Sequence, residues 1–145
     1  MKVKLPSLEL NWLNYPKDVS IPDIVTVGVN DIDYGGCYFE PEYNAVSVAD
    51  RSFSLERGLL LVREDNYEST VVHEFRHHLQ RVHFGVEPDV LNWKTEGNYK
   101  DSIIEYFSSS LTEMDALLYE VTHYPDDVNL QWYEWLVKHY ENRQV

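Results

Sequence analysis

The spacing of apolar residues changes at about residue 66, and this change limits the folds open to the chain. Upstream, the apolar stretches are short, rich in β-branched residues and interrupted by Gly and Pro, as in "DIVTVGVN" at 23–30. Downstream, apolar positions follow one another at steps of three and four, the spacing of one helix face: Val72, Phe75, Leu79 and Val82. Strands followed by helices predict an α+β fold.

The N-terminal half predicts a small antiparallel β-sheet. One strand is expected at 23–30, followed by the turn signal "DYGG". The segment 37–50 is expected to form two strands around a turn at "PEYN", the second of them over residues 45–49. The stretch "SFSLERGLLLV" at 52–62 is either a connection or a further strand.

Three helices are expected in the C-terminal half. The first should end near Gly85, because a residue without Cβ suits the left-handed position after a helix, and Pro88 follows it. A second apolar face runs from Ile103 to Val121, and a third helix is predicted at 126–142. The predicted architecture is therefore the small sheet, an active-site helix and two further helices, in one domain over residues 1–145.

The first of these helices contains "HEFRH" at 73–77. His73 and His77 are four residues apart, so both imidazoles lie on one helix face and can reach one zinc ion. Glu74 points about 100° away around the helix. There it can take a proton from a metal-activated water without being a ligand, which is the H-E-x-x-H arrangement of zinc metallopeptidases. The plainer alternative is a surface helix rich in histidine, and His78 is read as a surface residue.

A catalytic zinc usually has a third protein ligand, and two kinds of candidate exist. His83 follows His73 by ten residues, the third-histidine spacing of metzincins, but Gln80 stands where their glycine turns the chain. The helix is expected to continue and carry His83 about 15 Å along its axis, too far to share the metal. The next helix, in "SSSLTEMDALLYE" at 108–120, offers Glu113, Asp115 and Glu120. Glu113 and Asp115 border its apolar face on opposite sides, and geometry alone does not choose between them.

The pair of segments "HEFRH" and "TEMDALLY" at 112–119 resembles the gluzincin zinc metallopeptidases, and most closely the small single-domain minigluzincins. The resemblance covers about residues 45–120. It implies a minimal zincin fold, a peptide or protein substrate and Glu113 as the third zinc ligand. Gluzincins place an aspartate four residues after that glutamate to orient a histidine, but Leu117 stands there, so the orienting group must come from elsewhere. The resemblance also implies an exposed strand edge for substrate, around 45–49 or in "GLLLV" at 58–62.

The expected function is a zinc-dependent endopeptidase, with Zn2+ held by His73, His77 and Glu113 and with Glu74 as general base. The alternative is a non-catalytic zinc-binding regulatory or protein-interaction module. A latent enzyme is a third reading, in which one terminus, such as residues 1–16, covers the cleft. A hydrogen-bond donor for the transition state is expected from one of four residues: Tyr106, Tyr119, His123 or Tyr124.

Composition excludes several other classes. A net charge of −13 and a pI of about 4.7 make nucleic acid an unexpected partner. The single cysteine, Cys37, permits neither an internal disulfide nor a thiolate zinc cluster. No stretch has the length of a membrane span, and the first 18 residues lack the apolar run of a signal peptide, so a cytoplasmic location is expected.

Overall fold

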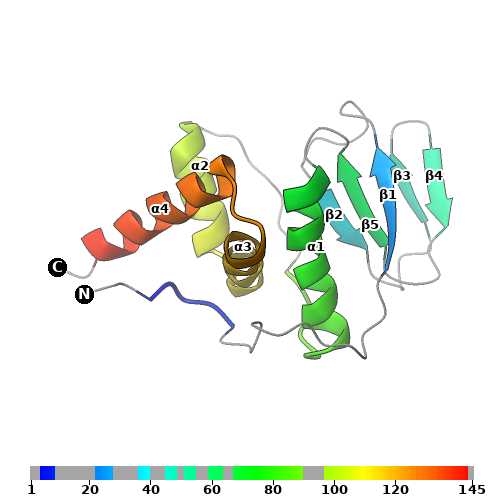
Figure 1. Ribbon diagram of the computed structural model, residues 1–145, viewed down its shortest axis with the longest axis horizontal. Helices are drawn as coiled ribbons and strands as arrows, with labels where there is room; N and C mark the ends of the chain where they lie inside the picture. Colours follow the sequence, from blue (N-terminus) through cyan, green and yellow to red (C-terminus); the bar gives the residue numbers. More distant parts are fainter. Residues whose placement is uncertain are drawn as a thin grey trace.

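The computed structural model describes residues 4–8, 22–27, 36–39, 45–48, 51–54, 59–63, 67–89 and 97–143. Its strands form two separate sheets (Figure 1). The first sheet has three strands in the order β1 (Asp23–Val27), β5 (Leu59–Arg63), β2 (Gly36–Phe39). The second pairs β3 (Ala45–Val48) with β4 (Arg51–Ser54) in antiparallel register.

The prediction of one small antiparallel sheet is wrong. β1 runs parallel to β5, with Ile24 opposite Leu60, and β2 runs antiparallel to β5, with Tyr38 opposite Leu60. The two strands expected to pair around "PEYN" do not pair with each other, since β2 pairs with β5 and β3 with β4. An alternating pattern identifies a segment as a strand, but it does not say which strand will be its neighbour.

The helices are α1 (Tyr67–Val82), α2 (Tyr99–Ser108), α3 (Leu111–His123) and α4 (Asp127–Asn142). Three helices therefore follow α1, because the single helix predicted from Ile103 to Val121 is interrupted at Ser109 and Ser110. Ser110 has an extended backbone, and its hydroxyl accepts a hydrogen bond from the N–H of Glu113 at 3.1 Å. A serine that caps a new helix in this way ends the preceding one.

The predicted architecture, a small antiparallel sheet followed by the motif helix and two further helices in a minimal zincin fold, is thus contradicted. The part of the chain whose side chains the structure describes is predominantly helical and contains four helices. In these described residues, no helix combines the length and the apolar character needed to cross a membrane.

The main hydrophobic core lies among α2, α3 and α4, and the N-terminal segment contributes to it. Leu5 is 5% exposed and packs in this cluster, and the segment that carries it runs along the helical half (Figure 1). The other buried members are these: Ile103, Phe107, Met114, Leu117 and Leu136. Within the described residues 4–8, Leu5 thus packs into the helical core.

Helix α1 lies between the three-stranded sheet and the other helices (Figure 1). Its polar side is covered as well as its apolar side, so Arg76 and Gln80 are fully buried while Val82, at the end of the predicted apolar stripe, is 49% exposed. Buried polar groups must find partners within the protein. Those partners, on α3, form the site described next.

Candidate metal centre

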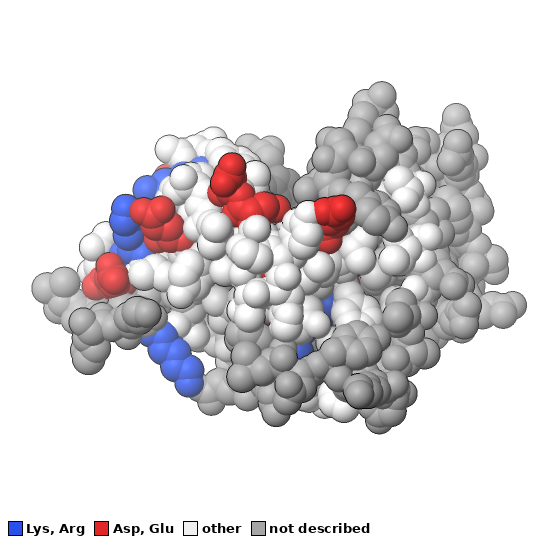
Figure 2. Space-filling model, viewed as in Figure 1, with Lys and Arg blue, Asp and Glu red and all other residues white. Residues whose placement is uncertain are grey.

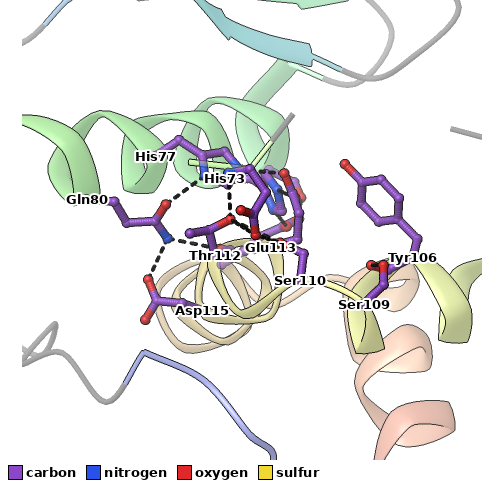
Figure 3. A network of polar contacts seen from close by, with 12 residues as sticks. His73, His77, Gln80, Tyr106, Ser109, Ser110, Thr112, Glu113 and Asp115 are labelled. Carbon is purple, nitrogen blue, oxygen red and sulfur yellow. Dashed lines mark hydrogen bonds and ion pairs between the residues drawn. The ribbon is translucent and has the colours of Figure 1, made fainter. Parts of the chain in front are cut away.

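Glu113 of α3 contacts both imidazoles of the "HEFRH" motif. Its Oε2 lies 2.9 Å from Nε2 of His73, and its Oε1 lies 3.0 Å from Nε2 of His77. The two imidazole centroids are 5.0 Å apart, and the rings are nearly perpendicular. Figure 3 shows the three side chains meeting between α1 and α3. The three predicted ligands therefore come together from two helices, 36 to 40 residues apart in the sequence.

The N-terminus of α3 holds Glu113 in place. "SLTE" at 110–113 has the pattern of a capping box, in which the glutamate side chain would return to the backbone N–H of Ser110. Here that N–H donates to the carbonyl of Phe107 instead, and the Glu113 carboxylate turns to the imidazoles. Asp89 secures the same turn by accepting hydrogen bonds from the hydroxyls of Ser110, at 2.7 Å, and Thr112, at 3.1 Å.

Nδ1 of His73 lies 3.0 Å from Oε1 of Glu120, which is also on α3. A carboxylate oxygen only accepts, so Nδ1 donates to Glu120, and Nε2, which faces Glu113, is the nitrogen from which a metal would displace a proton. Glu120 is itself fixed, since its Oε2 accepts hydrogen bonds from the Ser69 hydroxyl and, at 3.2 Å, from Nδ2 of Asn129. Leu117 stands where gluzincins place the aspartate that orients a histidine. In this structure Glu120 is the carboxylate that contacts Nδ1 of His73.

Nδ1 of His77 lies 2.9 Å from Oε1 of Gln80, so this imidazole also has a partner on the far side from Glu113. Its Nε2 is buried and makes no hydrogen bond with any described residue, since the approach to Glu113 is outside hydrogen-bonding geometry. A buried nitrogen that makes no hydrogen bond lowers the stability of the fold unless it binds another group, such as a metal ion.

Two imidazole nitrogens and one carboxylate are a donor set that suits zinc. Ligands about 2.1 Å from a tetrahedral zinc are roughly 3.4 Å from each other, so the contacts of Glu113 at 2.9 and 3.0 Å would lengthen by only a few tenths of an ångström around the ion. The side chains present, with the unsatisfied Nε2 of His77, therefore fit a metal held by His73, His77 and Glu113.

Glu74 lies beside this set and is buried. His73, Glu74 and His77 each offer a ligand atom within 4.8 Å of the others. Burial raises the pKa of Glu74, and the charges of Glu113 and Glu120 act in the same direction, while the two histidines partly oppose the shift. A carboxylate with a raised pKa is a better proton acceptor than an exposed one.

Without a metal, the centre is held together by its own charges. Burial by itself would lower the pKa of His73 and His77, but their contacts with carboxylates, above all Glu113, outweigh burial and raise both pKa values. Burial would raise the pKa of Glu113, and the two imidazoles overcome this and hold it well below its usual range. A positive charge on the imidazoles and a negative charge on Glu113 are therefore favoured together.

The rival ligand candidates lie elsewhere. Asp115 is fully buried and forms a bidentate ion pair with Arg76, at 2.7 and 3.1 Å, on a different side of α3. His83 is exposed and lies beyond the end of α1. His78, which was expected at the surface, is only 5% exposed and stacks on Phe75, so that expectation is wrong. Among the described acidic residues of α3, Glu113 is the one that meets both histidines.

The four candidate donors for the transition state have different surroundings. Tyr119 stacks against His123 and lies beneath the Arg76 guanidinium, and the Tyr124 hydroxyl bonds to Glu68. Figure 3 shows Tyr106 on α2. Its ring lies against that of Phe107, which in turn packs edge-on against the ring of His73.

The strand pairing bears on the two segments in which the resemblance implies an exposed edge for substrate. β5, which contains most of "GLLLV", is the middle strand of its sheet and is hydrogen-bonded on both sides, so it cannot accept a further strand. β3 pairs with β4 in the separate sheet. That part of the expectation is wrong for β5, because the resemblance gave no strand order.

Two roles in the centre were not predicted from the sequence: Glu120, which was considered only as a candidate ligand, as the partner of His73, and Gln80 as the partner of His77. Glu120 follows Glu113 by seven residues, which places both on one helix face, and Gln80 follows His77 by three, so the spacing was a usable signal in both cases.

No family model, curated protein or solved structure matches this chain. The chemistry of the centre is therefore argued from its own residues.

Proposed function

We propose that this protein is a zinc-dependent peptidase whose metal is held by His73, His77 and Glu113. The observation that carries the proposal is the approach of Glu113 to Nε2 of both histidines, at 2.9 and 3.0 Å, with Glu74 in the same cluster. Both imidazoles have a partner at Nδ1, which leaves Nε2 as the metal-binding atom on each ring. A histidine-rich surface helix would have no reason to bury these groups.

Zinc at this position would supply a Lewis acid that polarises a substrate carbonyl and makes water acidic. Glu74 takes the proton of the attacking water and later passes it to the leaving amine, and its burial, which raises its pKa, suits that task. Tyr106 is proposed to donate a hydrogen bond to the developing oxyanion.

A peptide substrate is supported by the likeness of "HEFRH" and "TEMDALLY" to gluzincin segments, and the residues themselves support metal-assisted hydrolysis. Charge narrows the substrate little further. Figure 2 shows acidic side chains in separate groups across the described helical half of this face, without one continuous patch. On this face, the described acidic residues thus do not define a docking site for basic peptides.

The first experiment is elemental analysis of zinc in protein purified without a metal-affinity tag. We expect near-stoichiometric zinc in the wild type and its loss in His77→Ala and Glu113→Gln. Glu134→Gln serves as the control, because its carboxylate is 56% exposed and pairs with Lys138 on the surface of α4. Absence of zinc from the wild type after reconstitution would contradict the proposal.

A peptide library scanned by mass spectrometry then tests hydrolysis, with Glu74→Gln as the inactive control. We expect this variant to retain zinc and to lose cleavage, because it keeps the ligands and removes the base. Zinc binding without cleavage of any peptide by the wild type would instead favour a non-catalytic zinc-binding module.

A further inference from the structure

Gln80 is fully buried and joins three groups that belong to two helices. Its Oε1 lies 2.9 Å from Nδ1 of His77, on its own helix. Its Nε2 donates to the carbonyl oxygen of Thr112 at 2.9 Å and to Oδ2 of Asp115 at 2.7 Å, both on α3 (Figure 3). One amide therefore connects a zinc-ligand candidate to the neighbouring helix.

The chemistry of these contacts leaves the amide one orientation. A backbone carbonyl and a carboxylate only accept hydrogen bonds, so the amide nitrogen must face Thr112 and Asp115. The amide oxygen then faces His77, and because this oxygen also only accepts, Nδ1 of His77 must be the donor. The proton is thereby fixed on Nδ1, and Nε2 is directed toward Glu113.

The orientation of Asp115 is fixed in turn by Arg76. The guanidinium makes two contacts with the Asp115 carboxylate, at 2.7 and 3.1 Å, and both side chains are fully buried. The guanidinium also lies over the rings of Phe84 and Tyr119, at 5.2 and 5.0 Å from their centroids. Asp115 therefore has little freedom to move away from Gln80.

We propose that Gln80 is a positioning residue for His77 and that the Arg76–Asp115 ion pair acts on the metal centre through it. The proposal rests on zinc binding by His73, His77 and Glu113. It gives the two histidines different supports, a carboxylate from Glu120 behind His73 and a neutral amide from Gln80 behind His77. The identity of residue 80 would then set how tightly zinc is held.

The test compares Gln80→Met with Leu79→Ala in the full chain. Methionine keeps the length of the side chain and removes both hydrogen-bonding functions, whereas Leu79→Ala destabilises the adjacent buried position without contacting His77. Zinc affinity is measured by chelator competition, and the Nδ1–H resonances of His73 and His77 are followed by NMR in metal-free protein. We expect Gln80→Met to weaken zinc binding about 10- to 100-fold and to lose or shift the His77 Nδ1–H signal alone.

A second variant covers the case in which Gln80→Met does not fold. Gln80→Leu suits a buried helix position and likewise removes both hydrogen-bonding functions, so Nδ1 of His77 loses its partner. We expect it to lose or shift the His77 Nδ1–H signal and to weaken zinc binding by a similar factor.

Unchanged affinity and unchanged signals in Gln80→Met would overturn the proposal, as would equal weakening by Leu79→Ala. If Gln80→Leu is the variant that folds, unchanged affinity and an unchanged His77 signal in it would overturn the proposal too. Failure of the proposed function is distinguishable, because the wild-type protein would then bind no zinc. The NMR comparison of metal-free proteins would still show whether Gln80 holds Nδ1–H of His77.

Discussion

Glu120 and Glu113 hold His73 from opposite edges of its ring, at 3.0 Å from Nδ1 and 2.9 Å from Nε2. The two carboxylates are seven residues apart, about two turns of α3, so one helix supplies both the proposed ligand and its support. Any movement of α3 relative to α1 would disturb both contacts together.

Replacing Glu120 with Gln should therefore weaken zinc binding. A neutral acceptor makes the imidazole less basic, and loss of such a partner typically costs about 10- to 100-fold in metal affinity. Chelator competition measures the change, and Glu134→Gln is the control, because that carboxylate is 56% exposed and pairs with Lys138 on the surface. Equal affinities of the two variants would contradict this role of Glu120.

Metal-free protein should lose stability as pH rises above about 6.5. The folded-state pKa values of His73 and His77 are raised above the usual value of 6.5, so their contribution is complete below that pH and is lost as pH rises through the raised values. The pKa of Glu113 is lowered from 4.5, so its contribution is present above that pH and is lost on acidification. The pKa of Glu74 is raised from 4.5, so its contribution is complete below that pH and is also lost as pH rises.

Urea unfolding over a pH series, with and without zinc, measures this dependence. Zinc affinity should change in the opposite direction and increase with pH, because the metal displaces protons from the imidazoles. In Glu113→Gln the histidines lose their main charged partner, so the dependence above pH 6.5 should flatten. A metal-free wild type whose unfolding free energy does not fall above pH 6.5 would refute the expectation.

Asp115→Asn should cost stability without removing the metal. Breaking a buried ion pair leaves the other charge uncompensated, and such changes cost about 3–5 kcal/mol. Chemical denaturation should show this loss, while elemental analysis at saturating zinc should still find near-stoichiometric metal. Asp127→Asn, at an exposed carboxylate of α4, is the control for a loss of charge alone. Loss of zinc in Asp115→Asn would return Asp115 to the list of ligands.

Ser110→Ala should lower both stability and zinc affinity. It removes the cap of α3, a change worth about 1 kcal/mol, and with it a contact that fixes Glu113 and Asp89. Asn98→Ala removes the corresponding cap of α2, where Asn98 accepts from Lys100. We expect the two variants to unfold at similar denaturant concentrations but zinc affinity to fall in Ser110→Ala alone. A parallel loss of affinity in both would assign the effect to general destabilisation.

Tyr106→Phe should lower kcat with little change in KM, provided the protein is the proposed peptidase. Removing one donor to a developing oxyanion typically costs about 100- to 1000-fold in kcat. Tyr99→Phe, at an exposed position on the same helix that packs against Trp135, should leave turnover unchanged. Steady-state kinetics on a cleaved peptide distinguishes the two, and equal turnover of both variants would remove Tyr106 from the mechanism.

The residues of the candidate metal centre were the part of this protein that could be named from the sequence, although metal binding by them stays a proposal. The spacing of His73 and His77 follows from helix geometry alone, and Glu113 followed from the likeness to gluzincins, while Asp115 was an equal candidate by spacing. What separates the two carboxylates is the packing of α1 on α3, which brings Arg76 to one and both imidazoles to the other. That packing is not encoded in the local pattern.

The sheet and the helix boundaries were harder for related reasons. Strand order depends on contacts between distant segments, so the alternation in residues 23–62 could not reveal that β1 and β5 run parallel. The break between α2 and α3 did have a local signal in the serines at 108–110, but the apolar spacing continues across it and concealed the boundary. Because α1 is covered on both sides, its polar side is buried as well as its apolar side, and an apolar stripe predicts only one buried side.

Leu5 shares its core with Leu136, so the helical half needs both ends of the described chain to complete its packing. During synthesis the ribosome must release α4 before the N-terminal segment can find its final neighbours. Contacts between such distant residues close late, because the entropy of the intervening loop must be overcome first. The nascent protein would also pass through a period in which the histidines of α1 have been made while the carboxylates of α3 that contact them have not.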